Sequence, residues 1–133
     1  MLFLKRNFLL LAGVAIYALL TGILDVLFYF FPEQIRTFDI ASVIVLGATI
    51  IFLIYIHRFK AKDTVSIERT EFKEITIWGI GFAILCLIEM FIGFVEYFKV
   101  NQIYEPVLIV GCILTFVGLY GLTRFLFLNK KYK

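Results

Sequence analysis

The chain has 133 residues, a formal net charge of +3 and a hydrophobic content of 62%. Soluble domains are nearer half apolar, so this composition excludes a water-soluble globular domain and indicates a protein whose solvent is lipid. A bilayer core about 30 Å thick takes about 20 helical residues per crossing, and four such crossings with their connections account for the whole chain. We therefore expect a single membrane domain over residues 1–133.

Four apolar runs follow one another along the chain, and each is long enough to cross a bilayer as a helix. The first span is expected at about residues 8–31, the second at 38–56, the third at 75–98 and the fourth at 104–127. In hydrocarbon a single span can satisfy its peptide groups only as a helix, and these runs are longer than barrel strands. The sequence predicts an all-α polytopic membrane protein, a four-helix bundle made of two sequential hairpins.

The basic residues fall almost entirely on one side of such a topology. Of the 13 lysines and arginines, only Arg36 and Lys99 belong to the other side. The positive-inside rule then places both termini and the connection at about 57–74 in the cytoplasm. We expect an integral protein of a prokaryotic plasma membrane.

The cytoplasmic connection is mixed in charge, and it is either a solvated loop or a docking surface for a partner or for anionic headgroups. Thr70 is the expected N-cap of the third helix, with Glu71 in the first turn, where the helix dipole favours negative charge.

An internal repeat is one interpretation of the chain. A shift of 68 residues aligns the two hairpins, with Gly13 on Gly81 and Gln34 on Gln102. Chance identity is substantial in so apolar a sequence, so a true duplication and coincidence both stay open. A duplication would make a 2+2 parallel repeat with its pseudo-two-fold axis along the membrane normal.

Three carboxylates lie inside the expected spans: Asp25, Glu89 and Glu96. A charged acid at mid-bilayer costs about 2.5 kcal/mol or more, so such residues normally face the bundle interior and have a partner or a function. Glu89 lies near the midplane, and the other two lie further outward. All three are candidates for ion or proton binding, or for pairing with another helix.

Small residues mark where helices are expected to approach each other closely. The predicted helix-packing positions are Gly81 and Gly93 in the third span, on the stripe that carries Glu89, and Gly111, Thr115 and Gly118 in the fourth.

Two functions from different classes stay open. The first is a non-enzymatic membrane subunit or accessory protein that packs against other membrane chains. The second is a small oligomeric carrier, coupled to cations or protons, with Glu89 as the exchanging carboxyl. The expected partners are the lipid bilayer and either further copies or a larger membrane complex. No catalytic constellation, metal cluster, cofactor motif or nucleic-acid partner is predicted.

Overall fold

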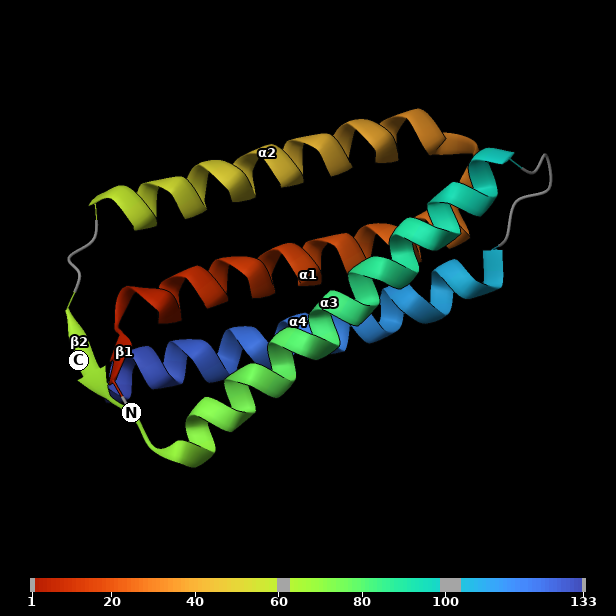
Figure 1. Cartoon of the computed structure of the whole chain (residues 1–133). Helices are drawn as coiled ribbons and strands as arrows, with labels where there is room; N and C mark the ends of the chain where they lie inside the picture. The colour runs from red at the N-terminus through yellow and green to blue at the C-terminus, as the bar shows by residue number, and fades with distance from the viewer. Residues whose placement is uncertain (1, 60–62, 99–103, 133) are drawn as a thin grey trace.

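Four long helices make up most of the fold (Figure 1). The computed structural model describes residues 2–59, 63–98 and 104–132. The helices are α1 (Arg6–Phe30), α2 (Ile35–Phe59), α3 (Arg69–Phe98) and α4 (Tyr104–Lys131), and the short 3-10 turn η1 (Pro32–Gln34) joins the first two.

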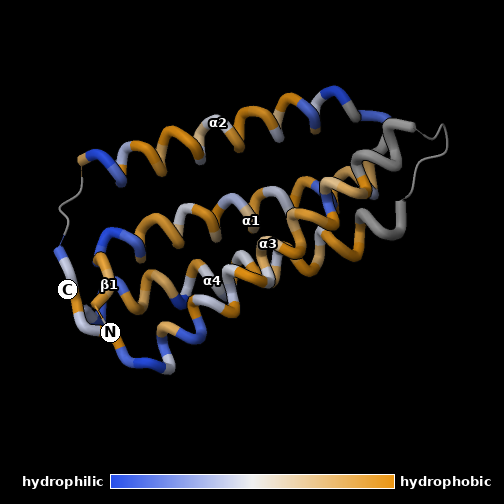
Figure 2. The backbone as a smooth tube through the Cα atoms, viewed as in Figure 1, coloured by the Kyte–Doolittle hydropathy of each residue, from blue (hydrophilic) through white to orange (hydrophobic). Residues whose placement is uncertain are grey.

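Each of these four helices in the described part of the chain is long and apolar enough to cross a membrane. The shortest has 25 residues and rises about 37 Å, which exceeds a hydrocarbon core of about 30 Å. Hydrophobic residues fill the helix middles, and hydrophilic residues gather toward the ends (Figure 2). The prediction of four long apolar helices is confirmed at the level of length and composition.

The helices extend beyond the spans expected from hydropathy. Helix α3 begins at Arg69 and α4 continues to Lys131, because polar residues continue the helical hydrogen-bonding pattern past the apolar stretch. The prediction that Thr70 caps α3 is wrong, since Thr70 lies in the first turn. The cap position belongs to Glu68, whose backbone N–H donates to the side chain of Glu71 at 3.2 Å, as in one half of a capping box.

Helices α1 and α4 lie antiparallel and form the most extensive helix contact of the described residues (Figure 1). Helix α2 packs on α1, and α3 packs on α4 over a smaller area. Helices α2 and α3 make no comparable contact in the described ranges. The order of packing is therefore α2, α1, α4, α3, with α2 held by α1 alone among the helices.

This order differs from the arrangement that a two-fold repeat would produce. A two-fold axis between the hairpins would turn the α1–α4 contact into an equal α3–α2 contact, which the described residues lack. The aligned glycines also differ, because Gly13 packs against Phe52 whereas a Cβ at Gly81 would meet nothing within 4 Å.

A two-stranded antiparallel sheet, which the all-α prediction did not include, joins the N-terminus to the connection between α2 and α3. Strand β1 (Leu2–Leu4) pairs with β2 (Thr64–Ser66), with Phe3 opposite Val65. Such a ribbon is marginal by itself. Here Phe3 and Val65 pack against the buried core, so the ribbon is anchored at the end of the bundle where both termini lie (Figure 1).

The core lies mainly along α1 and α4. One buried cluster, near the ribbon, includes Phe8, Ala15, Trp78 and Phe125, and a second, nearer the middle, includes Leu114. Many large apolar side chains elsewhere are exposed, as lipid contact requires. Because lipid tails are as apolar as these side chains, close packing has to hold the helices together.

Candidate functional site

Small residues bring the backbones of α1 and α4 together beside the candidate site. A Cβ added at Gly22 would lie 2.6 Å from the backbone nitrogen of Thr115, and one at Gly118 would lie 2.7 Å from the carbonyl oxygen of Ala15. The hydroxyl of Thr115 donates to the carbonyl of Gly111 at 2.8 Å. Three of the sequence-predicted packing positions, Gly111, Thr115 and Gly118, thus lie on the α1 side of α4.

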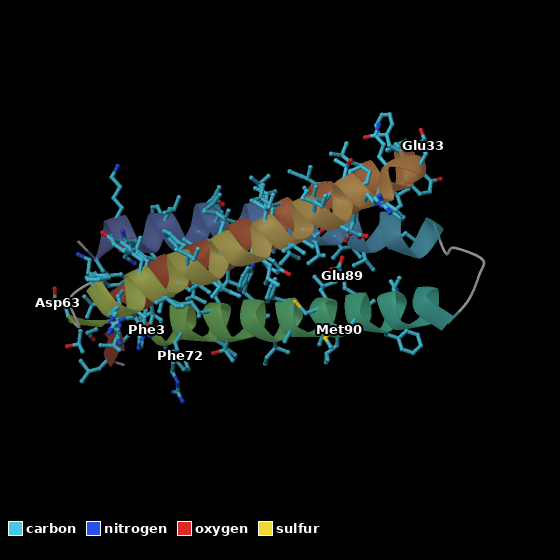
Figure 3. All side chains as sticks on the ribbon, turned by 90° about the horizontal axis from the view of Figure 1, so that it is seen from above. Phe3, Glu33, Asp63, Phe72, Glu89 and Met90 are labelled. Carbon is cyan, nitrogen blue, oxygen red and sulfur yellow. The ribbon has the colours of Figure 1, made fainter. Side chains whose placement is uncertain are left out.

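Glu89 lies beside a hollow of about 300 Å³ between α1, α3 and α4. Its side chain extends from α3 toward the other helices (Figure 3). The walls come from three helices: Tyr17, Ala18 and Thr21 of α1, Phe82, Cys86, Glu89 and Met90 of α3, and Leu114 of α4. The hollow is therefore a meeting point of elements distant in sequence, near the middle of the predicted spans.

The polar groups of this hollow are hydroxyls, a thiol and a carboxylate. Tyr17 and Thr21 lie four residues apart, on one face of α1. Cys86 precedes Glu89 by one helical turn. Within the described part of the chain, the Glu89 carboxylate has neither a hydrogen bond nor an ion pair to another side chain. The arrangement can accept a proton, or a cationic or hydrogen-bond-donating group that enters the hollow.

The other sequence-predicted acids do not line this hollow. Asp25 is half-buried one turn beyond Thr21, and a Cβ at Gly111 would lie 2.8 Å from its Cβ, so Asp25 lies at the α1–α4 contact. Glu96 and Gly93 belong to α3, at its end, where the surroundings of the residues lie outside what the structure describes.

Gly81 differs from the glycines of α4. A Cβ at this position would meet nothing within 4 Å, so no neighbouring helix approaches it among the described residues. Its role as a helix-packing position stays a prediction.

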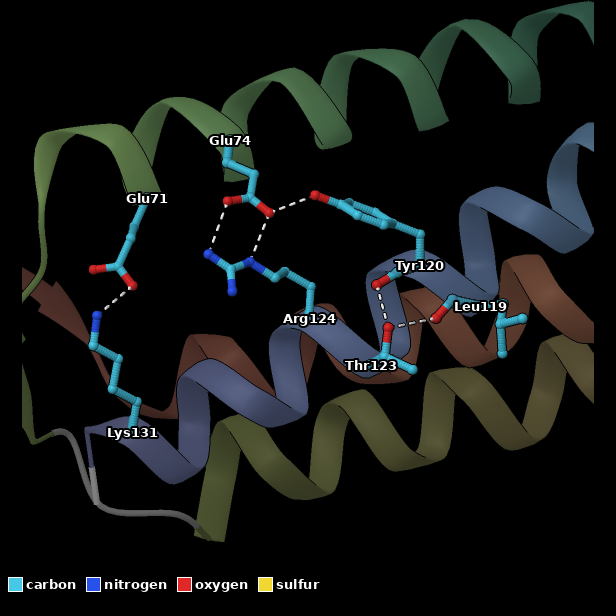
Figure 4. A network of polar contacts seen from close by, with 7 residues as sticks. All are labelled: Glu71, Glu74, Leu119, Tyr120, Thr123, Arg124 and Lys131. Carbon is cyan, nitrogen blue, oxygen red and sulfur yellow. Dashed lines mark hydrogen bonds and ion pairs between the residues drawn. The ribbon is translucent and has the colours of Figure 1, made fainter.

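The guanidinium of Arg124 forms an ion pair toward the end of the bundle where the termini lie (Figure 4). Arg124 of α4 donates to both carboxylate oxygens of Glu74 on α3, at 2.8 and 3.2 Å, and the hydroxyl of Tyr120 donates to the same carboxylate at 2.6 Å. The pair joins α3 to α4 at a position about 22 Å along α3 from Glu89.

A second polar group surrounds Glu71, which is buried. Lys131 donates to its carboxylate at 3.3 Å, and the hydroxyl of Tyr132 donates to it as well. The hydrogen bond to Glu71 raises the pKa of Tyr132, because it favours the neutral phenol. These contacts attach the end of α4 to the first turn of α3.

Sequence reasoning missed Tyr17, Thr21 and Cys86 as neighbours of Glu89. They lie on other turns and another helix, and the sequence alone does not say which faces of α1 and α3 meet. A weak signal existed, since Thr21 shares the face of α1 that carries Gly22 and Asp25.

In the described ranges no group of three or more His, Cys, Asp or Glu side chains could hold a metal ion. Comparison with known proteins gives no relative: no family model, no curated protein and no solved structure matches the chain.

Proposed function

We propose that this protein is an integral membrane subunit or accessory protein, without enzymatic chemistry of its own, that packs against other membrane chains. The observation that carries this proposal is the open arrangement of the helices. Among the described residues, α2 packs on α1 and has no comparable contact with another helix, and α3 contacts α4 over a small area, so both outer helices present long faces to the surroundings.

Glycines on these outer faces distinguish them from an ordinary lipid-facing surface. Additional Cβ atoms at Gly47 of α2, and at Gly79 and Gly81 of α3, would meet nothing within 4 Å. A glycine inside a helix costs about 1 kcal/mol relative to alanine. Such glycines would allow the backbone of a further helix to approach closely, as Gly22 and Gly118 do between α1 and α4.

Both termini and the connection between α2 and α3 lie at one end of the bundle, which the positive-inside rule assigns to the cytoplasm. In this orientation the carboxylate of Glu89 lies within the membrane, without a basic partner in the described part of its own chain. A partner chain can supply that group, since a carboxylate at this depth is costly when it is alone.

The hollow beside Glu89 favours a second candidate function, a carrier coupled to protons or cations. A carboxylate next to a cavity and two hydroxyls can exchange a proton for a bound cation. Four helices can barely enclose a pathway, so this function requires two or more copies of the chain.

One experiment separates the two candidates. The tagged chain is purified from its native membrane in mild detergent, and the same preparation is reconstituted to measure uptake of an organic cation driven by a pH gradient. The subunit proposal expects a second membrane chain that copurifies with wild type and is lost in Gly81→Leu but retained in Ile51→Leu, which keeps the bulk of an exposed side chain of α2, together with no uptake. It fails if the chain purifies alone.

If the protein is a carrier, we expect the purified chain to take up the organic cation, and we expect Glu89→Gln to abolish this uptake. Glu68→Gln is the matched control, because Glu68 is exposed at the start of α3 and far from the hollow. Uptake that both variants retain excludes the carrier.

A further inference from the structure

A second cavity, outside the Glu89 hollow, opens between α1 and α2 at the end of the bundle that carries the termini. Its volume is about 550 Å³, within the range of about 300–1,000 Å³ typical of small-molecule sites. Its walls are Leu10, Leu11 and Val14 of α1 with Leu53, Ile54, His57 and Arg58 of α2. We call this cavity the α1–α2 groove.

The chemistry of the groove changes along its length. The residues toward the middle of the helices are aliphatic, whereas His57 and Arg58 stand at the end of α2, next to the connection. One end is therefore apolar at membrane depth, and the other is basic at the membrane boundary. A molecule that fits this gradient has an apolar chain and an anionic head.

Arg6 adds a second guanidinium at the basic end. Its Nη1 donates to the carbonyl oxygen of His57, a groove residue, at 2.7 Å. Arg6 is only 8% exposed, and its Nε has no hydrogen-bond partner among the described residues. Arg6 does not line the groove itself, so it adds a buried positive charge behind the wall at His57.

The cations of this end divide into two sets. On the α3–α4 side, Arg124 is paired with Glu74, and Lys131 with Glu71. On the α1–α2 side, neither Arg6 nor Arg58 forms an ion pair with a described carboxylate. Asp63 lies near this side, since its backbone carbonyl accepts from the N–H of Lys5 at 2.8 Å, but its side chain forms no ion pair with either arginine among the described residues.

We propose that the α1–α2 groove binds one anionic phospholipid, with an acyl chain along the aliphatic walls and the headgroup phosphate at Arg58, near the buried charge of Arg6. Basic pockets between membrane helices at the cytoplasmic side are a known type of site for acidic headgroups. Guanidinium groups suit phosphate because they donate in a fixed fork. The lipid would also contact both α1 and α2, and so strengthen the attachment of α2.

The test measures lipid retention and thermal stability of the full chain in detergent. Phosphatidylglycerol or phosphatidylcholine is added to delipidated protein, bound lipid is counted by native mass spectrometry, and the melting temperature is recorded. We expect one phosphatidylglycerol to be retained and to raise the melting temperature, with phosphatidylcholine bound about tenfold more weakly. Equal retention of the two lipids would overturn the proposal.

Two pairs of variants locate the site. Arg58→Gln should weaken phosphatidylglycerol binding about tenfold, whereas Arg36→Gln, an exposed arginine at the opposite end of α2, should leave it unchanged. Ile54→Trp fills the groove and should reduce retention, whereas Ile51→Trp, outside the groove and 70% exposed, should not. Equal effects within either pair would show general adsorption and overturn the assignment.

A last measurement distinguishes a site for a lipid from a site for a free anion. Inorganic phosphate at millimolar concentration should neither raise the melting temperature nor displace bound phosphatidylglycerol, because it has no chain for the aliphatic walls. If phosphate alone reproduces the stabilisation, the site is an anion site and the lipid proposal is wrong.

Discussion

Trp78 of α3 occupies the space that Gly121 of α4 leaves open. A Cβ at Gly121 would lie 2.6 Å from the indole Nε1, and that N–H donates to the carbonyl of Val117 at 3.0 Å. Phe125 meets the same ring edge-on, with ring centroids 4.9 Å apart. The indole is thus positioned by packing and by one hydrogen bond, and it fixes the angle at which α3 meets α4.

Gly121→Ala is expected to displace the indole and destabilise the protein by about 1–3 kcal/mol, the usual range for overpacking a filled core. Trp78 is the one tryptophan of the chain, so a shift in its fluorescence emission maximum reports the displacement directly. Gly81→Ala is the control, because its methyl group would meet nothing within 4 Å. An unchanged emission maximum in Gly121→Ala would contradict this packing.

Gly22→Val should separate α1 from α4, because backbone atoms of α4 occupy the space that the side chain needs. The free energy of unfolding is expected to fall by about 3 kcal/mol, the upper end for overpacking. The reason is that backbone atoms can move less than the tip of a side chain. Unfolding in SDS, followed by circular dichroism, measures it. Gly47→Val on α2 makes the same chemical change in open space, so comparable losses in both variants would indicate an effect of helix propensity instead.

The pair Glu74 and Arg124 should show a coupling of about 1 kcal/mol in a double-mutant cycle with Glu74→Gln and Arg124→Gln. The bidentate geometry favours coupling, but the side chains are 28% and 34% exposed, so solvent screens the pair. The same SDS unfolding assay supplies the four free energies. Strict additivity of the two single changes would show that the pair contributes nothing.

Orientation can be tested with single cysteines on a background in which Cys86 and Cys112 are changed to serine. Gln34→Cys, in η1, should react with a membrane-impermeant maleimide from outside the cell. Lys130→Cys, near the end of α4, should react only after lysis, because the positive-inside rule places that end in the cytoplasm. The reverse pattern of labelling would refute the predicted orientation, although the fold would be unaffected.

Sequence reasoning found the four helices because their signal is local. The length of an apolar run can be read from consecutive residues, without knowing which other part of the chain it contacts. It also found the face of Gly111, Thr115 and Gly118, since a helical period groups them whatever their partner is. It did not find the strand pairing of Phe3 with Val65, because neither short strand has a pattern of its own and each depends on the other.

The long-range contacts had no counterpart in the sequence pattern. Arg124 was recognised as basic, but its pairing with Glu74 spans 50 positions and depends on how far α3 extends into water. Likewise, Tyr17 becomes a neighbour of Glu89 only through the packing order in which α1 and α4 are central. That order is set by the close fit of small residues, which hydropathy does not measure.

The pairing of α1 with α4 has a consequence for biogenesis. In the proposed membrane setting, α1 is made and inserted before α4, so its alanine and glycine face lacks its main neighbour until α2 and α3 have been synthesised. A ribosome stalled before α4 would therefore leave α1 without its principal neighbour.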